Sequence, residues 1–287
     1  MQFMRLQTAL VSLFLLLCPC ALCYGQLRFA SVGGEKGYSA MRASYEANLD
    51  NGWILTPKYG YYRMSDKEID EAGSTSRFEL QVRYELSDSF DVLGEIGLQP
   101  QALGYEAVKY QAGVRWLPFY YFAGIKNPVL LIKGGQERYR TYVNAEGKDL
   151  PYGAFRQVGT RGQIEAQADV GFLHLQGTWQ KVIKYNSRVP EDVTFSWADV
   201  PYMTAVIQGF LKDAYALHIS YPSRYLTPYV SWARYHYDQR RAVASALSAG
   251  VHIRLWDVEV SGGIEVFEPR REENRKTYFS LSVDLPL

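Results

Sequence analysis

Residues 76–86 read SRFELQVRYEL and alternate strictly between polar and apolar side chains. Because successive side chains of an extended strand point to opposite faces, Phe78 and Leu80 share one face while Arg77 and Glu79 share the other. An amphipathic helix would instead repeat about every 3.6 residues. The stretch therefore predicts a β-strand with one apolar face and one charged face.

The same alternation recurs in residues 41–49, 108–116, 163–170 and 258–266. Such segments run to about 10–12 residues, the length of a strand that crosses a bilayer, whereas strands of soluble proteins average about 5–6 residues. Their polar faces carry long charged side chains at mid-strand, and their apolar faces carry small residues flanked by aromatic ones. This polarity favours a barrel with lipid outside and a wet lumen inside over a soluble β-sandwich, which also alternates.

The charged faces of these strands supply the candidate lumen wall. Acidic and basic side chains are interleaved on them, so residues on adjacent strands are able to neutralise one another, and the mixed signs predict weak ion selectivity. The alternative interpretation is a solvated, cross-paired wall with no further role. The side chains that we expect to line the lumen are Arg77, Glu79, Gln81, Arg83, Glu85, Glu95, Lys109, Arg115, Glu165, Asp169, Arg254, Glu259 and Glu265.

The N-terminus has the three-part plan of a cleaved signal peptide. Arg5 precedes an apolar run at 9–17, which is too short for a spanning helix, and small or turn-forming residues follow. We therefore divide the chain into a signal peptide, residues 1–25, and a barrel domain, residues 26–287. All three cysteines, at positions 18, 20 and 23, fall in the signal peptide. The exported domain would then hold no disulfide, no thiolate metal site and no cysteine nucleophile.

Turn signals between the alternating segments predict about fourteen strands, with twelve as the main alternative. The pair Asn51-Gly52 is the strongest hairpin signal, because a tight turn of this type needs positive φ. Residues 196–212 are ambiguous, and we interpret them as a loop helix because that keeps short and long connections alternating. The expected strands are 26–33, 39–49, 53–63, 76–86, 89–98, 106–117, 122–142, 159–170, 172–185, 213–221, 226–238, 244–256, 258–268 and 276–286. Longer connections are expected at 64–75, 99–105, 144–158 and 186–202.

Composition narrows the classes of partner. The formal net charge is +1, from 31 basic and 30 acidic residues, which gives no electrostatic reason to expect nucleic acid. The 23 tyrosines suit strands and membrane interfaces. No metal-ligand spacing, phosphate-binding loop or nucleophile-elbow motif occurs. We therefore predict no cofactor and no metal site.

Residues 26–287 as a whole resemble bacterial outer-membrane β-barrel proteins. The resemblance rests on the signal peptide, the strand pattern and the last segment, where Phe279, Leu281 and Val283 lie on one face. It implies an all-β, transmembrane, antiparallel up-and-down barrel with short periplasmic turns and longer external loops. It also implies outer-membrane lipids and the barrel-insertion machinery as partners. The chain ends in Pro286-Leu287 where members of this class often carry a terminal aromatic residue.

Three functions follow from this resemblance and from the residues. A barrel of about fourteen strands is wide enough for a porin-like channel that passes small hydrophilic solutes, unless side chains or loops fill it. The alternative is a plugged structural or accessory barrel that aids export or surface assembly.

The third function is an outer-membrane lipid hydrolase. His218-Ile219-Ser220 locally resembles the His-x-Ser pair of outer-membrane phospholipase A, although the Tyr221-Pro222 that follows departs from that family. This pair would face the lumen near the periplasmic end, whereas a lipid-cleaving site needs the opposite placement. We therefore assign no catalytic residue and expect no enzyme.

Overall fold

The computed structural model describes residues 24–35, 38–49, 51–65, 72–102, 105–118, 124–141, 155–185, 211–237, 243–268 and 275–286. The predicted signal peptide lies outside this set except for its last two residues, Tyr24 and Gly25. These two residues begin the first strand and pair with Asn48 and Ala47 of the second. The predicted start of the barrel domain at residue 26 therefore falls inside the first strand.

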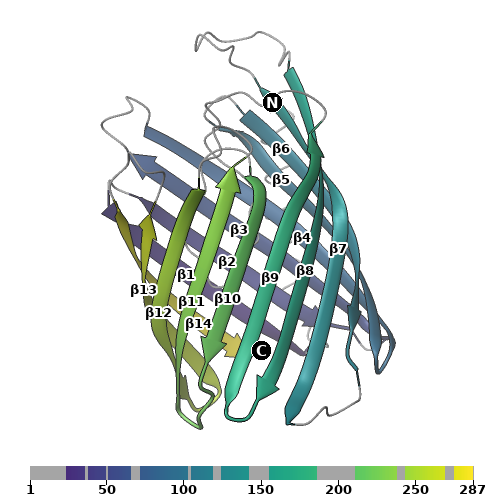
Figure 1. Ribbon diagram of the computed structural model, residues 1–287, viewed down its shortest axis with the longest axis vertical. Coiled ribbons are helices and arrows are strands. Elements are labelled where there is room, and N and C mark those ends of the chain that lie inside the picture. The colour runs from purple at the N-terminus through teal and green to yellow at the C-terminus, as the bar shows by residue number, and fades with distance from the viewer. Residues whose placement is uncertain are drawn as a thin grey trace.

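Within the described residues, fourteen antiparallel strands follow one another around a closed barrel, and the last pairs with the first (Figure 1). The all-β barrel of about fourteen strands is thus confirmed, and the twelve-strand alternative is wrong. No helix among the described residues is both long enough and apolar enough to cross a membrane. The strands are β1 (Tyr24–Gly34), β2 (Ser39–Asn48), β3 (Trp53–Ser65), β4 (Ala72–Ser87), β5 (Phe90–Ala102), β6 (Tyr105–Trp116), β7 (Ile125–Thr141), β8 (Phe155–Val170), β9 (Leu173–Tyr185), β10 (Leu211–Ser220), β11 (Leu226–Tyr237), β12 (Val243–Leu255), β13 (Val258–Glu268) and β14 (Lys276–Pro286).

The barrel closes at the seam between β1 and β14. Their backbones pair continuously from Gln26 opposite Pro286 to Gly34 opposite Tyr278. Inside the seam, the guanidinium of Arg28 donates from Nε and Nη2 to the two carboxylate oxygens of Asp284, at 2.6 and 2.7 Å. A two-pronged pair of this kind fixes geometry as well as charge, so it holds the two terminal strands in one register.

Tight turns gather at one end of the barrel, the lower end in Figure 1. Gly52 and Gly171 occupy these turns with φ of 80° and 63°, which glycine adopts without steric cost. The predicted short turns at both positions are therefore present. The strand ends that are separated by the longer stretches of sequence, such as the end of β9 and the start of β10, lie at the opposite, upper end.

The outer surface of the barrel is apolar and the inner surface is polar. Large apolar side chains are exposed all around the outside, including Val230 (50% exposed), Leu247 (55%) and Leu281 (56%). The next residues along these strands point inward and are enclosed. They include Ser231 after Val230 and Ser248 after Leu247. On β13, Glu265 likewise follows the exposed Ile264, and these three inward residues are 2–4% exposed. This is the reverse of a soluble protein, and it suits a barrel whose outer wall meets hydrocarbon.

Aromatic rings border the apolar outer surface at the short-turn end. Trp53 packs against Tyr84 with ring centroids 4.7 Å apart, and Phe172 packs edge-on against Tyr221 at 5.8 Å. Trp256 stands at the tip of its turn and is 93% exposed. Amphipathic rings at this height are typical of the zone where lipid headgroups meet hydrocarbon.

Several strands extend further at the upper end than the sequence predicts. Residues 72–75, 99–102 and 155–158 were expected in loops, yet they continue β4, β5 and β8. Residues 211–212, expected at the end of a loop helix, begin β10, and the rest of that predicted helix lies outside the described residues. These extensions lack strict alternation, for example in Ala72-Gly73-Ser74-Thr75, because backbone pairing alone sustains a ladder above the apolar zone.

A charge placed on the outer surface tests whether that surface faces lipid. Leu247→Arg puts a cation near the middle of β12, and we expect it to lower barrel stability by about 2–4 kcal/mol. Leu255→Arg, on the same face but at the end of the strand, is the matched control and should lose only about 0–1 kcal/mol. Urea-dependent folding into phosphatidylcholine vesicles measures both. Equal effects of the two variants would contradict an outer surface in hydrocarbon.

Candidate functional site

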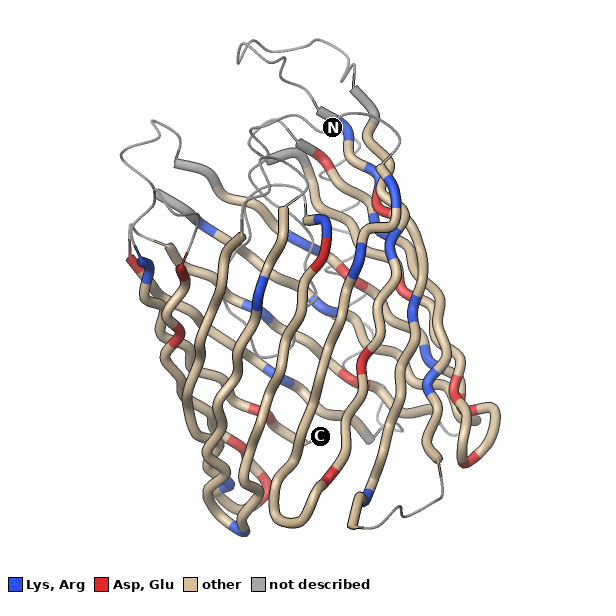
Figure 2. The backbone as a smooth tube through the Cα atoms, viewed as in Figure 1, with Lys and Arg blue, Asp and Glu red and all other residues tan. Residues whose placement is uncertain are grey.

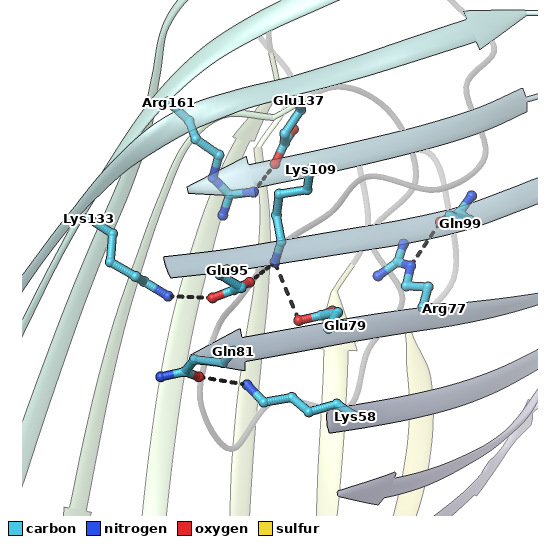
Figure 3. A network of polar contacts seen from close by, with 10 residues as sticks. All are labelled: Lys58, Arg77, Glu79, Gln81, Glu95, Gln99, Lys109, Lys133, Glu137 and Arg161. Carbon is cyan, nitrogen blue, oxygen red and sulfur yellow. Dashed lines mark hydrogen bonds and ion pairs between the residues drawn. The ribbon is translucent and has the colours of Figure 1, made fainter. Parts of the chain in front are cut away.

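A network of buried charges crosses the inner wall of β4 to β7 (Figure 3). Lys109 of β6 is at its centre, and its side chain is 0% exposed. Its ammonium pairs with Glu95 of β5 and, at 3.4 Å, with Glu79 of β4. The other carboxylate oxygen of Glu95 lies 3.4 Å from Nζ of Lys133 on β7. Two cations and two carboxylates from four strands are thus linked together.

Gly97 explains how Lys109 reaches across a whole strand. In the register, Gly97 of β5 lies opposite both Glu79 of β4 and Lys109 of β6. Because glycine has no side chain, the inner surface between these two residues is open, and the long lysine side chain crosses it. The missing side chain at Gly97 therefore allows Lys109 and Glu79 to pair across the strand that lies between them.

A second buried pair extends the network toward β8. Arg161 pairs with Glu137 of β7, and these side chains are 0% and 3% exposed. Glu137 also accepts a hydrogen bond from the hydroxyl of Tyr139 at 2.6 Å. Arg161 lies opposite Gly135 in the register, and a Cβ atom at Gly135 would clash with the Tyr110 carbonyl and with Gln111 on β6, so this position requires glycine for close packing of β6 and β7. Removing one partner of such an enclosed pair would leave an uncompensated charge.

A third group of charges surrounds Asp91 nearer the short-turn end. Its carboxylate lies 3.1 Å from Nη1 of Arg115 and 3.8 Å from Nε of Arg83. Higher on the same wall, neutral amides replace the acids. Arg77 donates from Nε to Gln99 at 2.8 Å, and Lys58 donates to Gln81 at 3.3 Å. The wall therefore alternates between paired charges and amide–cation contacts.

The strand register places all thirteen predicted wall residues on the inner face, although their part in lining a passage stays a prediction. Glu165 accepts a hydrogen bond from Gln176 at 2.7 Å, and Asp169 pairs with His174 at 2.7 Å. Toward the short-turn end Glu259 contacts His252 and Arg254, at 3.0 and 3.9 Å. Glu265 is buried on β13, whereas Glu85 is exposed at the end of β4.

Sequence reasoning missed Lys133, Glu137 and Arg161 of this network and Asp91 of the third group. Residues 129–132 of β7 are consecutively apolar, and Gly134-Gly135 follow, so the polar–apolar alternation that would reveal Lys133 and Glu137 is interrupted. A β-bulge between Lys126 and Val129 also shifts the register. The signal that could have found Lys133 and Glu137 was their position on a long predicted strand beside other charged strands. Asp91 and Arg161 have the same strand parity as the predicted residues Glu95 and Glu165.

His218 and Ser220 share the inner face of β10, as their spacing predicts. His218 Nδ1 lies 2.7 Å from Oγ of Ser231 on β11, and Ser220 lies opposite His174 on β9. The two residues thus face the interior in the short-turn half, on the side of the wall opposite the apolar outer surface. A lipid outside the barrel would therefore not reach this pair. Among the described residues, no group of three or more His, Cys, Asp and Glu side chains is placed to hold a metal ion.

The wall opposite the charge network is apolar and aromatic in its upper half. It is formed by the strands from β10 through β14 to β3, and its buried members are Val32, Tyr38, Ala40, Tyr62, Leu211, Ala214, Ala233, Tyr235, Tyr237, Ala244, Ala246, Phe267 and Tyr278. Arg42 and Arg77 both lie over the ring of Tyr62, at 5.6 and 5.3 Å from its centroid. The interior is therefore two-sided, with charge concentrated on one half of the circumference.

Replacing the central cation tests the energetic role of the network. In Lys109→Met the carboxylates of Glu95 and Glu79 lose their shared partner, and we expect a loss of about 3–5 kcal/mol in unfolding free energy. Lys58→Met is the matched control, because the hydrogen-bond partner of Lys58, Gln81, is neutral. The control should lose less than about 1.5 kcal/mol. Urea titration of the folded barrel in vesicles measures both, and an unaffected Lys109→Met barrel would contradict the assignment.

No protein-family model matches this chain, and no curated protein matches it. Among solved structures, it is similar to CdiB from Acinetobacter baumannii, with a TM-score of 0.52, 10% identity, and coverage of 92% of this chain and 60% of that one. This chain thus spans about three-fifths of CdiB. OccAB1 of Acinetobacter baumannii gives a TM-score of 0.54 at 6% identity and covers 92% and 96% of the two chains. A bacterial polysaccharide outer membrane secretin gives 0.50 at 11% identity, with 92% and 98% covered. The closed fourteen-strand barrel and these likenesses show that the chain has the fold of the bacterial outer-membrane β-barrel proteins.

Proposed function

We propose that this chain is an outer-membrane channel of the porin kind that passes small hydrophilic solutes. The observation that carries the proposal is the charged inner wall of β4 to β8 inside a barrel whose outer surface exposes apolar side chains. A wall of fixed charges offers polar solutes a path that hydrocarbon does not. The short turns would lie in the periplasm and the longer connections outside the cell.

The packing of the interior supports a narrow passage. Fourteen strands enclose enough space for a channel unless it is filled. Yet the side chains of Lys109, Glu95 and Arg161 are at most 2% exposed, so their surroundings leave little room for water at their level. Such a constriction favours small solutes over polymers.

Two partners from the sequence analysis belong to this proposal. The outer surface would be solvated by outer-membrane lipids, as its exposed Phe279 and Leu281 on β14 suggest. The same strand closes the barrel against β1. Its amphipathic pattern would therefore have two roles, recognition by the barrel-insertion machinery and closure of the barrel.

A second candidate is a plugged structural or accessory barrel that aids export or surface assembly. It is favoured by the enclosure of both inner walls. Ala233 and Tyr235, on the apolar wall, are 0% exposed, just as Lys109 is on the charged wall. An interior filled at this level would serve as a rigid scaffold in the membrane rather than as a pore.

Conductance across a planar bilayer separates the two candidates. The folded chain should give discrete, voltage-independent current steps in neutral salt if it is a channel. A chain that shows heat-modifiable mobility on a gel, and is therefore folded, but never conducts would remove the channel and favour the plugged barrel.

Charge selectivity gives a finer test of the channel. Glu165 faces the interior and its hydrogen-bond partner Gln176 is neutral, so its charge should attract cations into the passage. Glu165→Gln is expected to lower the ratio of cation to anion permeability, measured as a smaller reversal potential in a salt gradient. Glu106→Gln is the control, because Glu106 lies on the outer face beside Arg140, and it should leave that potential unchanged. Equal shifts in both variants would contradict a passage along the inner wall.

A further inference from the structure

The outer surface of β9, β10 and β11 carries an aromatic pair in the upper half of the barrel. Trp179 of β9 and Tyr215 of β10 lie opposite each other in the register, with nearly parallel rings 6.4 Å apart. Both side chains point outward and are 39% and 40% exposed. Tyr215 also meets the ring of His236 edge-on at 5.8 Å. The rings of Trp179 and Tyr215 form a flat platform on an outer surface that is otherwise largely apolar at and below their level.

Two exposed cations flank this platform. Lys181 Nζ lies 6.0 Å from the ring centroid of Trp179, and Arg234 of β11 lies opposite Tyr215 in the register. Asp213 lies opposite Lys181, but its carboxylate is hydrogen-bonded to Nδ1 of His236. Among the described residues, no acidic side chain forms an ion pair with Lys181 or Arg234. Because neighbouring strands lie about 4.8 Å apart, these long side chains are able to converge on one ligand over β10.

The cations lie at the upper edge of an apolar strip. One row lower on the same strands are Leu217 and Trp232, which are 43% and 42% exposed. Gly177 completes this row, and a Cβ atom there would meet no other atom within 4 Å, so the surface is open below Trp179. Figure 2 shows Lys and Arg, together with acidic colour on β10, in the upper parts of these front strands and uncharged residues below them. Charge above, rings at the boundary and apolar surface beneath match the layers of a lipid molecule.

We propose that Lys181, Arg234, Trp179 and Tyr215 form a binding site for a phosphate-bearing lipid of the membrane leaflet that meets the upper end. The phosphate lies between the two cations, and the acyl chains run down past Gly177, Leu217 and Trp232. This inference rests on the proposed insertion of the barrel in a membrane. Lipid is the occupant that the surface fits, because a soluble anion would gain nothing from the exposed apolar strip directly below the charges.

Lipid binding by the folded full chain in detergent micelles tests the site. Native mass spectrometry with bis-phosphorylated lipid A as the probe should show bound lipid, and the dephosphorylated form should bind much more weakly. Each cation near an anionic lipid surface contributes about 1 kcal/mol, so Lys181→Gln with Arg234→Gln should weaken binding about 25-fold. Inorganic phosphate at the same concentration should not displace the lipid.

Arg224→Gln is the matched control. Arg224 also lies over an aromatic ring, that of Tyr225 at 5.0 Å, but at the short-turn end of the same hairpin. It should bind lipid A as the unmodified chain does. Equal binding by the double variant and the unmodified chain, equal loss in the control, or displacement by phosphate would overturn the site.

Gel mobility and conductance distinguish this proposal from the channel. A folded, conducting barrel that shows no preference for phosphorylated lipid would overturn only the lipid site and leave the channel proposal standing. A chain that does not fold in micelles would contradict the proposed insertion of the barrel in a membrane as well.

Discussion

Closure of the backbone ladder is the constraint on which the rest of this structure depends. A strand edge facing hydrocarbon would leave its N–H and C=O groups unpaired, at a cost of several kcal/mol for each group. Pairing of β14 with β1 removes that edge, and the two-pronged contact of Arg28 with Asp284 fixes the same seam from inside. A partly formed barrel is therefore unstable, because its free strand edges are unpaired. The apolar outer surface is stable only once β14 has paired with β1.

The interior charges depend on that closure in turn. An enclosed ammonium such as that of Lys109 is stable only beside carboxylates, because the desolvation of a lone charge is not recovered. Its partners come from β5 and β4, and Gly97 between them provides the open surface that the lysine crosses. Strand pairing and charge pairing thus specify each other: the register brings the charges together, and a shifted register would leave them buried and unpaired.

The sequence predicts the fold well where one period is uninterrupted, as in residues 76–86, because each face of such a strand meets a single environment. It predicts the orientation of side chains less well where the two faces of a strand have similar polarity. In β7 the apolar run at 129–132 hides which residues point inward, and the bulge beyond Lys126 changes the parity. Contacts between strands could not be predicted from the sequence either. The i, i+2 spacing of His218 and Ser220 predicts that they share a face, but the hydrogen bond between His218 and Ser231 depends on the register of β11 against β10.

The hairpin of β10 and β11 shows why that register is strongly determined. Outward, it presents Tyr215 and Leu217 to the apolar side; inward, it presents His218, whose bond to Ser231 satisfies a buried polar group. A slip of one residue would reverse both faces, exposing the imidazole to hydrocarbon and burying leucine among amides. Each strand therefore meets two environments, an apolar one at its outer face and a polar one at its inner face. For the same reason, the proposed lipid site is able to occupy the outer faces of three strands whose inner faces enclose polar side chains, since alternate residues point to opposite sides of the wall.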